Sequence, residues 1–160
     1  HLPLLWQQNL ESSKYFKAIQ DFAATEGADA IGLSASAEEE IAQLADEDKA
    51  EFLEMAGVTE PGLNKLIRAA YHLLDLRTFF TAGGKETRAW TFKAGMKAPQ
   101  TAGVIHSDFE RGFIRAETIA FADLDKLGSV KAVKEAGKLR SEGKEYIVND
   151  GDIIEFRFNV

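Results

Sequence analysis

Apolar residues recur at three- and four-residue spacing through much of the first half of the chain, which is the period of one helical face. The first such segment begins after Ser13, a residue suited to cap a helix, and ends at Gly27, a residue suited to terminate one. The same spacing predicts three further helices, over residues 36–45, 47–56 and 61–74. We therefore expect the first 76 residues to be mainly helical.

One short segment interrupts this helical pattern. The run Asp29 to Leu33 is largely apolar and is flanked by turn-forming residues, which predicts a buried strand. A helix followed by a strand is half of an α/β unit. Ser36 and Glu39 then have the spacing of a capping box, so we expect Ser36 to cap the next helix.

From Arg77 onward the pattern becomes strand-like. Two such segments, 78–82 and 85–92, are joined by Gly83-Gly84, a two-residue loop that tolerates the positive φ of a hairpin turn. The remaining pattern predicts a helix over 98–105, a strand over 112–121, helical turns over 123–138 and two closing strands hinged at 149–152. Hairpin, helix and further strands is the order of a β-grasp module, so the expected fold class is α+β.

Composition agrees with an ordered protein, because 45% of the residues are hydrophobic and 28% are charged. No apolar run approaches the ~20 residues that a membrane-spanning helix needs, so we expect no membrane partner. The chain has no cysteine, which excludes disulfides, thiolate metal sites and cysteine nucleophiles. A cytoplasmic location is the expectation that fits these features.

The net charge of −7 is unevenly distributed. Residues 1–78 carry six Lys and Arg against fourteen Asp and Glu, whereas residues 79–160 carry thirteen against twelve. The acidic excess between Glu38 and Glu60 is typical of a solvated helical surface, and an acidic docking surface is the alternative. The second half is not basic enough to indicate nucleic-acid binding from its charge alone.

The densest group of chemically versatile side chains is His106, Asp108, Glu110, Arg111 and Arg115. A histidine beside two carboxylates suits proton transfer or metal binding, although the spacing matches no metal motif. A simpler interpretation is that His106 and Asp108 hydrogen-bond the local loop between helix and strand. Contact of the arginines with RNA phosphates is a third possibility.

A phosphate-binding loop of the form Gly-x-x-x-x-Gly-Lys-Ser/Thr does not occur in this sequence. The nearest glycine cluster, Gly83-Gly84-Lys85, lacks that spacing, and we interpret it as a hairpin turn. Hydrolysis of a nucleotide is therefore not expected from these residues alone, and we assign no catalytic residue and no metal ligand.

Several separated segments together resemble the C-terminal part of the YchF / Obg-like ATPase family, including its TGS domain. The resemblance is carried by Ile105–Ala116, Tyr146–Val160, Glu60–Tyr71, Thr78–Gly83 and Arg88–Trp90. It implies the end of a P-loop nucleotide-binding domain over residues 1–44, a helical connector over 45–76 and a ubiquitin-like β-grasp TGS domain over 77–160.

The same resemblance implies that the parent protein is a ribosome-associated P-loop ATPase or GTPase that uses ATP or GTP with Mg²⁺, whereas this chain alone binds no cofactor and is inactive. The loop after the predicted strand resembles a base-recognition motif, so Ser34, Ala35 and Ser36 are implied to face the purine. An ordinary helix N-cap is the alternative explanation of that loop. For the TGS domain the implied ribosome or RNA contacts are His106, Arg111, Arg115, Lys85 and Arg88.

Two other interpretations of the whole chain remain open. It could be a stand-alone β-grasp protein-interaction module without nucleotide function, which a pull-down from lysates with and without ribosomes would distinguish. It could also be the TGS domain of a threonyl-tRNA synthetase or of a stringent-response enzyme, but the Ser34 loop and the helical connector argue against that.

Overall fold

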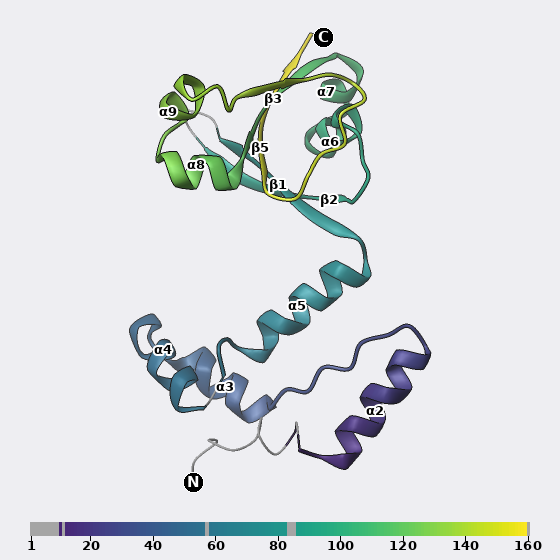
Figure 1. The fold of residues 1–160 in the computed structure, drawn as a ribbon, viewed down its shortest axis with the longest axis vertical. Helices are drawn as coiled ribbons and strands as arrows, with labels where there is room; N and C mark the ends of the chain where they lie inside the picture. Colours follow the sequence, from purple (N-terminus) through teal and green to yellow (C-terminus); the bar gives the residue numbers. More distant parts are fainter. Residues whose placement is uncertain (1–9, 11, 57, 83–85, 160) are drawn as a thin grey trace. The chain divides into compact units, whose positions relative to one another are not determined.

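The computed structural model describes residues 10, 12–56, 58–82 and 86–159 (Figure 1). It divides the chain into two compact units, which we call unit 1 (His1–His72) and unit 2 (Leu73–Val160). Three features lie outside the described residues: Gly57, which follows the predicted helix 47–56, the predicted hairpin turn at Gly83-Gly84, and the candidate site residue Lys85. Within the described part, no helix has both the length and the apolar character needed to cross a bilayer.

Unit 1 contains helices wherever the apolar spacing predicts them: α2 (Lys14–Thr25), α3 (Ala35–Gln43), α4 (Asp46–Met55) and α5 (Gly62–Leu73). The hydroxyl of Ser13 accepts a hydrogen bond from the Phe16 N–H at 3.4 Å and so caps α2, as predicted. Gly27 follows that helix with φ of +65°, a conformation that favours glycine.

The predicted buried strand Asp29–Leu33 is wrong. The structure has no regular secondary structure over this run, and Asp29 and Leu33 are exposed. A buried strand needs a neighbouring strand to satisfy its backbone N–H and C=O groups. Because unit 1 contains no other strand among its described residues, this segment has no ladder to join.

The cap of α3 also differs from the prediction. Ser34, two residues before the expected Ser36, is the N-cap, and its hydroxyl accepts a hydrogen bond from the Ala37 N–H at 3.3 Å. Ser36 lies inside the helix, 3.1 Å from the Ser34 hydroxyl. A capping Ser or Thr accepts a hydrogen bond from the backbone N–H two or three residues after it. Ser34 and Ser36 are both suited to that role near the start of α3, so the sequence alone does not show which of them is the cap.

Unit 2 contains one five-stranded mixed sheet in the order β2-β1-β5-β3-β4. Its strands are β1 (Leu76–Ala82), β2 (Thr87–Lys93), β3 (Phe113–Ala120), β4 (Arg140–Glu142) and β5 (Asp152–Phe158). Strands β1 and β5 are parallel, with Phe80 opposite Ile153, and the other neighbouring pairs are antiparallel. The predicted hairpin strands therefore share one sheet with the closing strand, and the α+β fold class is confirmed.

One predicted strand of this sheet is misplaced. Residues 146–148, expected to precede the closing turn as a strand, form only an isolated bridge between Ile147 and Lys97. The strand that pairs with β3 is instead β4, which has only three residues. Such a short edge strand carries too few residues to show an alternating pattern.

Helices cover both faces of the sheet (Figure 1). The helix α6 (Ala98–Ile105), which matches its prediction, packs with the following helix α7 (Ser107–Arg111) on the face that carries Phe79, Phe92 and Phe156. The other face carries Phe80, Ile119 and Ile153 and is covered by α8 (Phe121–Leu127) and α9 (Val130–Glu135), the two helices of the predicted helical region. Each face of the sheet thus carries its own apolar cluster, which packs against the helices on that side.

Candidate functional site

A hollow of unit 2 lies beside the end of the sheet and has a volume of about 790 Å³. Its wall is made by Thr78 and Phe80 of β1, by the junction 120–122 that leads into α8, by Arg140 of β4 and by the turn 149–152. Apolar side chains with a few converging polar groups are the usual lining of a binding pocket. This hollow is therefore a candidate site that the sequence did not indicate.

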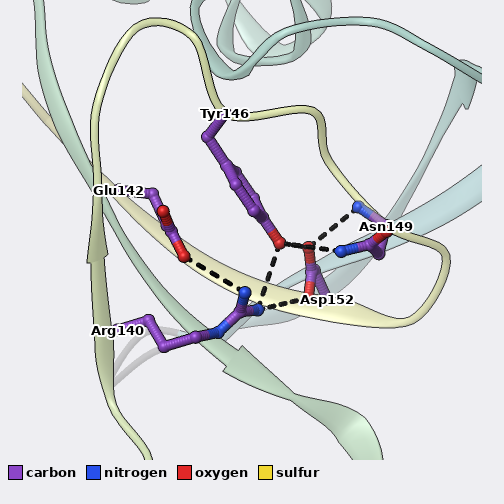
Figure 2. Close-up of polar contacts among 5 residues, drawn as sticks. All are labelled: Arg140, Glu142, Tyr146, Asn149 and Asp152. Atoms are coloured by element: carbon purple, nitrogen blue, oxygen red, sulfur yellow. Dashed lines mark hydrogen bonds and ion pairs between the residues drawn. The ribbon is translucent and has the colours of Figure 1, made fainter.

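A connected set of polar side chains holds one wall of this hollow (Figure 2). The Arg140 guanidinium donates to Asp152 Oδ1 and to the Tyr146 hydroxyl, each at 3.1 Å, and it also binds Glu142. The Tyr146 hydroxyl donates to Asp152 Oδ2 at 2.6 Å, and that oxygen also accepts the Asn149 N–H at 2.9 Å. The carboxylate of Asp152 is thus fully engaged although it is almost completely buried, with 2% of the residue exposed.

The protonation of Tyr146 supports this network. Burial raises the pKa of Tyr146 above its usual value, and the hydrogen bond to Asp152 raises it further. The phenol therefore stays neutral at physiological pH and remains a donor to the carboxylate. Tyr146 and Asp152 therefore form a fixed structural pair within the network.

The turn 149–152 is also fastened to β1. Asp150 Oδ1 accepts the Thr78 N–H at 2.7 Å, and the Gly151 N–H donates to the Thr78 carbonyl, also at 2.7 Å. Gly151 adopts φ of +80°, which a side chain would strain. The polar rim of the hollow is therefore held in place before any ligand arrives.

Two of the predicted RNA-binding arginines are engaged with carboxylates. Arg111, at the end of α7, forms an ion pair with Asp108 of the same helix. Arg115 binds Glu117 at 2.8 Å on β3, and Arg157 of β5 binds the same carboxylate at 3.0 Å. Hydrogen bonds from Arg157 and then Arg115 lower the pKa of Glu117 to about 2.

His106 has the local role that the simplest interpretation of its loop predicts. Its Nδ1 accepts the Asp108 N–H at 3.2 Å and caps α7, a short helix that the sequence pattern did not indicate. His106 therefore stabilises the loop between α6 and β3, and this hydrogen bond confirms the local interpretation.

Arg88 differs from the other predicted contacts. Its guanidinium lies 4.4 Å from the centre of the Trp90 ring, and no carboxylate pairs with it among the described residues. The strand register places Arg88 on the α6 face, together with Trp90, whereas Arg115 alternates with Ile119 on the α8 and α9 face. The structure therefore does not gather these two arginines on one surface of the sheet.

In unit 1 the predicted base-recognition residues Ser34, Ala35 and Ser36 lie at the start of α3, where the Ser34 hydroxyl caps the helix. One turn further on, the Glu38 carboxylate accepts the N–H groups of Gly62 and Leu63 at 2.7 and 3.2 Å. Glu38 thereby caps α5, a role that the sequence did not reveal because the two segments are 24 residues apart.

Unit 2 is an α+β domain, and its sequence matches a known protein family. The family YchF-GTPase_C, described as "Protein of unknown function (DUF933)", matches residues 76–159. This chain belongs to that family, and the predicted resemblance to the C-terminal part of YchF / Obg-like ATPases is confirmed.

Several named relatives agree. The chain is 61% identical over 142 residues to the "Ribosome-binding ATPase YchF" of Bacillus subtilis (strain 168), covering 89% of this chain and 39% of that protein. It is 50% identical over 133 residues to "Obg-like ATPase 1" of Pongo abelii, covering 83% of this chain and 33% of that protein. The structure of the Schizosaccharomyces pombe YchF GTPase superposes with a TM-score of 0.83 at 34% identity, covering 95% of this chain and 41% of that one. The chain thus spans about two fifths of the length of the first of these relatives.

Proposed function

We propose that this chain is a C-terminal portion of a ribosome-binding, nucleotide-dependent ATPase or GTPase, and that unit 2 is a TGS module that contacts the ribosome or RNA. The single observation that carries the proposal is the 61% identity to the Bacillus subtilis protein whose name states ribosome binding and ATPase activity. The expected cytoplasmic location follows from that partner.

The nucleotide chemistry belongs to the intact protein. ATP or GTP with Mg²⁺ requires a phosphate-binding loop, and the sequence described here contains none. At the start of α3, the purine would be contacted by Ser34, Ala35 and Ser36. The backbone N–H groups would supply these contacts, because the Ser34 hydroxyl already accepts a hydrogen bond from the Ala37 N–H. We expect the chain alone to show no turnover of ATP or GTP.

The proposed RNA-binding arginines differ in whether a carboxylate already pairs with them. Arg88 is exposed, stacks on Trp90 and pairs with no carboxylate in the described part of the chain, so it is available to a phosphate. Arg111 and Arg115 would each have to leave a carboxylate partner before binding a phosphate. We therefore place the main RNA contact at Arg88, with Lys85, His106, Arg111 and Arg115 contributing less.

Sedimentation of the chain with purified ribosomes at increasing salt tests this proposal. Recovery should fall with salt, because binding through phosphates releases counterions. Arg88→Glu should lower recovery more than Arg115→Glu, which serves as the matched charge reversal on the opposite face of the sheet. Recovery that is independent of salt and of both substitutions would refute an RNA contact on unit 2, and capture of other proteins from ribosome-depleted lysate would favour the stand-alone interaction module.

A further inference from the structure

We propose that the hollow of about 790 Å³ in unit 2 binds a basic peptide segment, with an arginine or lysine side chain seated between Phe121 and Asp150. Only the ribosomal source of this peptide rests on the proposed function. If the chain binds the ribosome as proposed, the peptide segment would belong to a basic ribosomal protein.

The aromatic part of the site is exposed. Phe121 begins α8 with 54% of the residue exposed, and its ring centre lies 6.2 Å from that of Phe80, which lines the same hollow. An aromatic face that is open to solvent attracts a guanidinium or an ammonium group and also packs against the apolar stem of such a side chain. The Phe80 ring supports Phe121 from within the hollow.

The charge of the lining selects the same ligand. The Arg140 guanidinium is already shared among Asp152, Glu142 and Tyr146, so it offers little to an incoming anion. Asp150 is exposed and forms no ion pair with any described residue, and its one hydrogen bond is accepted by Oδ1 from Thr78. A phosphate would therefore meet an uncompensated carboxylate, whereas a cation would neutralise it.

The site is rigid enough to select a ligand. The network of Figure 2 fixes the turn 149–152 on one side, and the two backbone contacts to Thr78 fix it on the other. A site that is ordered before binding loses less conformational entropy when the ligand enters. Binding should therefore leave the positions of Asp150 and Gly151 nearly unchanged.

The experiment is a nuclear magnetic resonance titration of the chain with three probes. They are a blocked peptide of alternating arginine and leucine, the same peptide with each arginine replaced by neutral citrulline, and an oligouridylate as the RNA probe. We expect the arginine peptide to shift the amide signals of Phe121 and Gly151 at saturable concentrations. Citrulline should weaken binding about threefold or more, because it retains the shape but loses the charge.

Two substitutions and two matched controls locate the site. Asp150→Asn keeps an oxygen that can accept the Thr78 N–H but removes the charge, and Phe121→Ala removes the exposed ring. Each should weaken the arginine peptide about threefold. Asp125→Asn, on α8 but outside the hollow, and Ile114→Ala, an exposed apolar side chain on β3, should leave the affinity unchanged.

The results separate this inference from the proposed function. Equal binding of the citrulline peptide, equal losses in Asp125→Asn and Asp150→Asn, or saturation of the same amides by oligouridylate alone would each overturn the basic-peptide site. If that happens while ribosome recovery remains sensitive to Arg88→Glu, only the pocket inference fails. If the peptide binds as expected but no salt-sensitive ribosome recovery occurs, the pocket stands and the ribosomal source of its ligand is refuted.

Discussion

Replacement of Asp152 by alanine should destabilise unit 2 more than any surface substitution. The residue is 2% exposed, and its carboxylate accepts hydrogen bonds from Arg140, Tyr146 and the Asn149 N–H. Alanine would leave all three donors without this acceptor. The turn 149–152, which also contacts β1, would lose its main support.

The magnitude follows from how well each donor can be rehydrated. The Arg140 side chain is 39% exposed and Asn149 is exposed, so water can replace part of what they lose. Tyr146 is half-buried and is rehydrated less easily. Loss of this buried carboxylate, with its three donors only partly rehydrated, costs about 3 kcal/mol. For a domain of this size, that corresponds to a fall in the melting temperature of roughly 15 °C.

Urea unfolding followed by tryptophan fluorescence measures this loss in unit 2 alone. A Trp6→Phe background leaves Trp90 of β2 as the only tryptophan, so the signal reports the sheet. Asp125→Ala is the matched control, because Asp125 is exposed and forms no ion pair among the described residues. A loss below about 1 kcal/mol in Asp152→Ala, or an equal loss in Asp125→Ala, would show that the network of Figure 2 does not hold the turn.

Three further outcomes are expected. Because the pKa of Glu117 is lowered to about 2 in the folded state, its contribution to stability is present above pH 4.5 and is lost as the pH falls toward 2. After solvent screening this contribution is about 1 kcal/mol. Glu117→Gln should therefore make the free energy of unfolding less dependent on pH in the acid range. Glu38→Ala should lower both the helicity of unit 1, measured by circular dichroism, and its stability, by about 1 kcal/mol, since the N–H of Gly62 loses its acceptor. Retention of both helicity and stability would refute the cap. Gly112→Ala would drive its Cβ into the Asn159 carbonyl oxygen, so thermal unfolding should show a loss of about 2 kcal/mol or more. An unchanged melting temperature would contradict that close approach.

The sequence predicted the elements that local patterns determine. Helix α6 has Pro99 in its first turn and matches its predicted bounds, and the hairpin strands were visible from their strand-like composition. The run 29–33 was wrong because strand formation depends on a neighbour that no local pattern supplies. Strand β4 was missed because its three residues are too few to show a period.

The candidate site was less predictable because it depends on register and on distant contacts. The sequence shows that Arg88 and Arg115 lie on strands, but the pairing of β1 with β5 and of β5 with β3 decides that they occupy opposite faces. Arg140 and Asp152 are twelve residues apart and belong to β4 and β5, which have β3 between them in the sheet. Their contact therefore depends on the strand order of the whole sheet. No spacing rule links them in advance.

The position of β5 in the middle of the sheet has a consequence for biosynthesis. Among the described strands, β5 alone joins β1 and β2 on one side to β3 and β4 on the other, and it is the last of the five to be translated. The two halves of the sheet therefore cannot close while residues 152–158 are still inside the exit tunnel. A nascent chain stalled before Asp152 should remain open to proteolysis in this region. One stalled on an added C-terminal linker long enough to carry Phe158 clear of the tunnel should resist it.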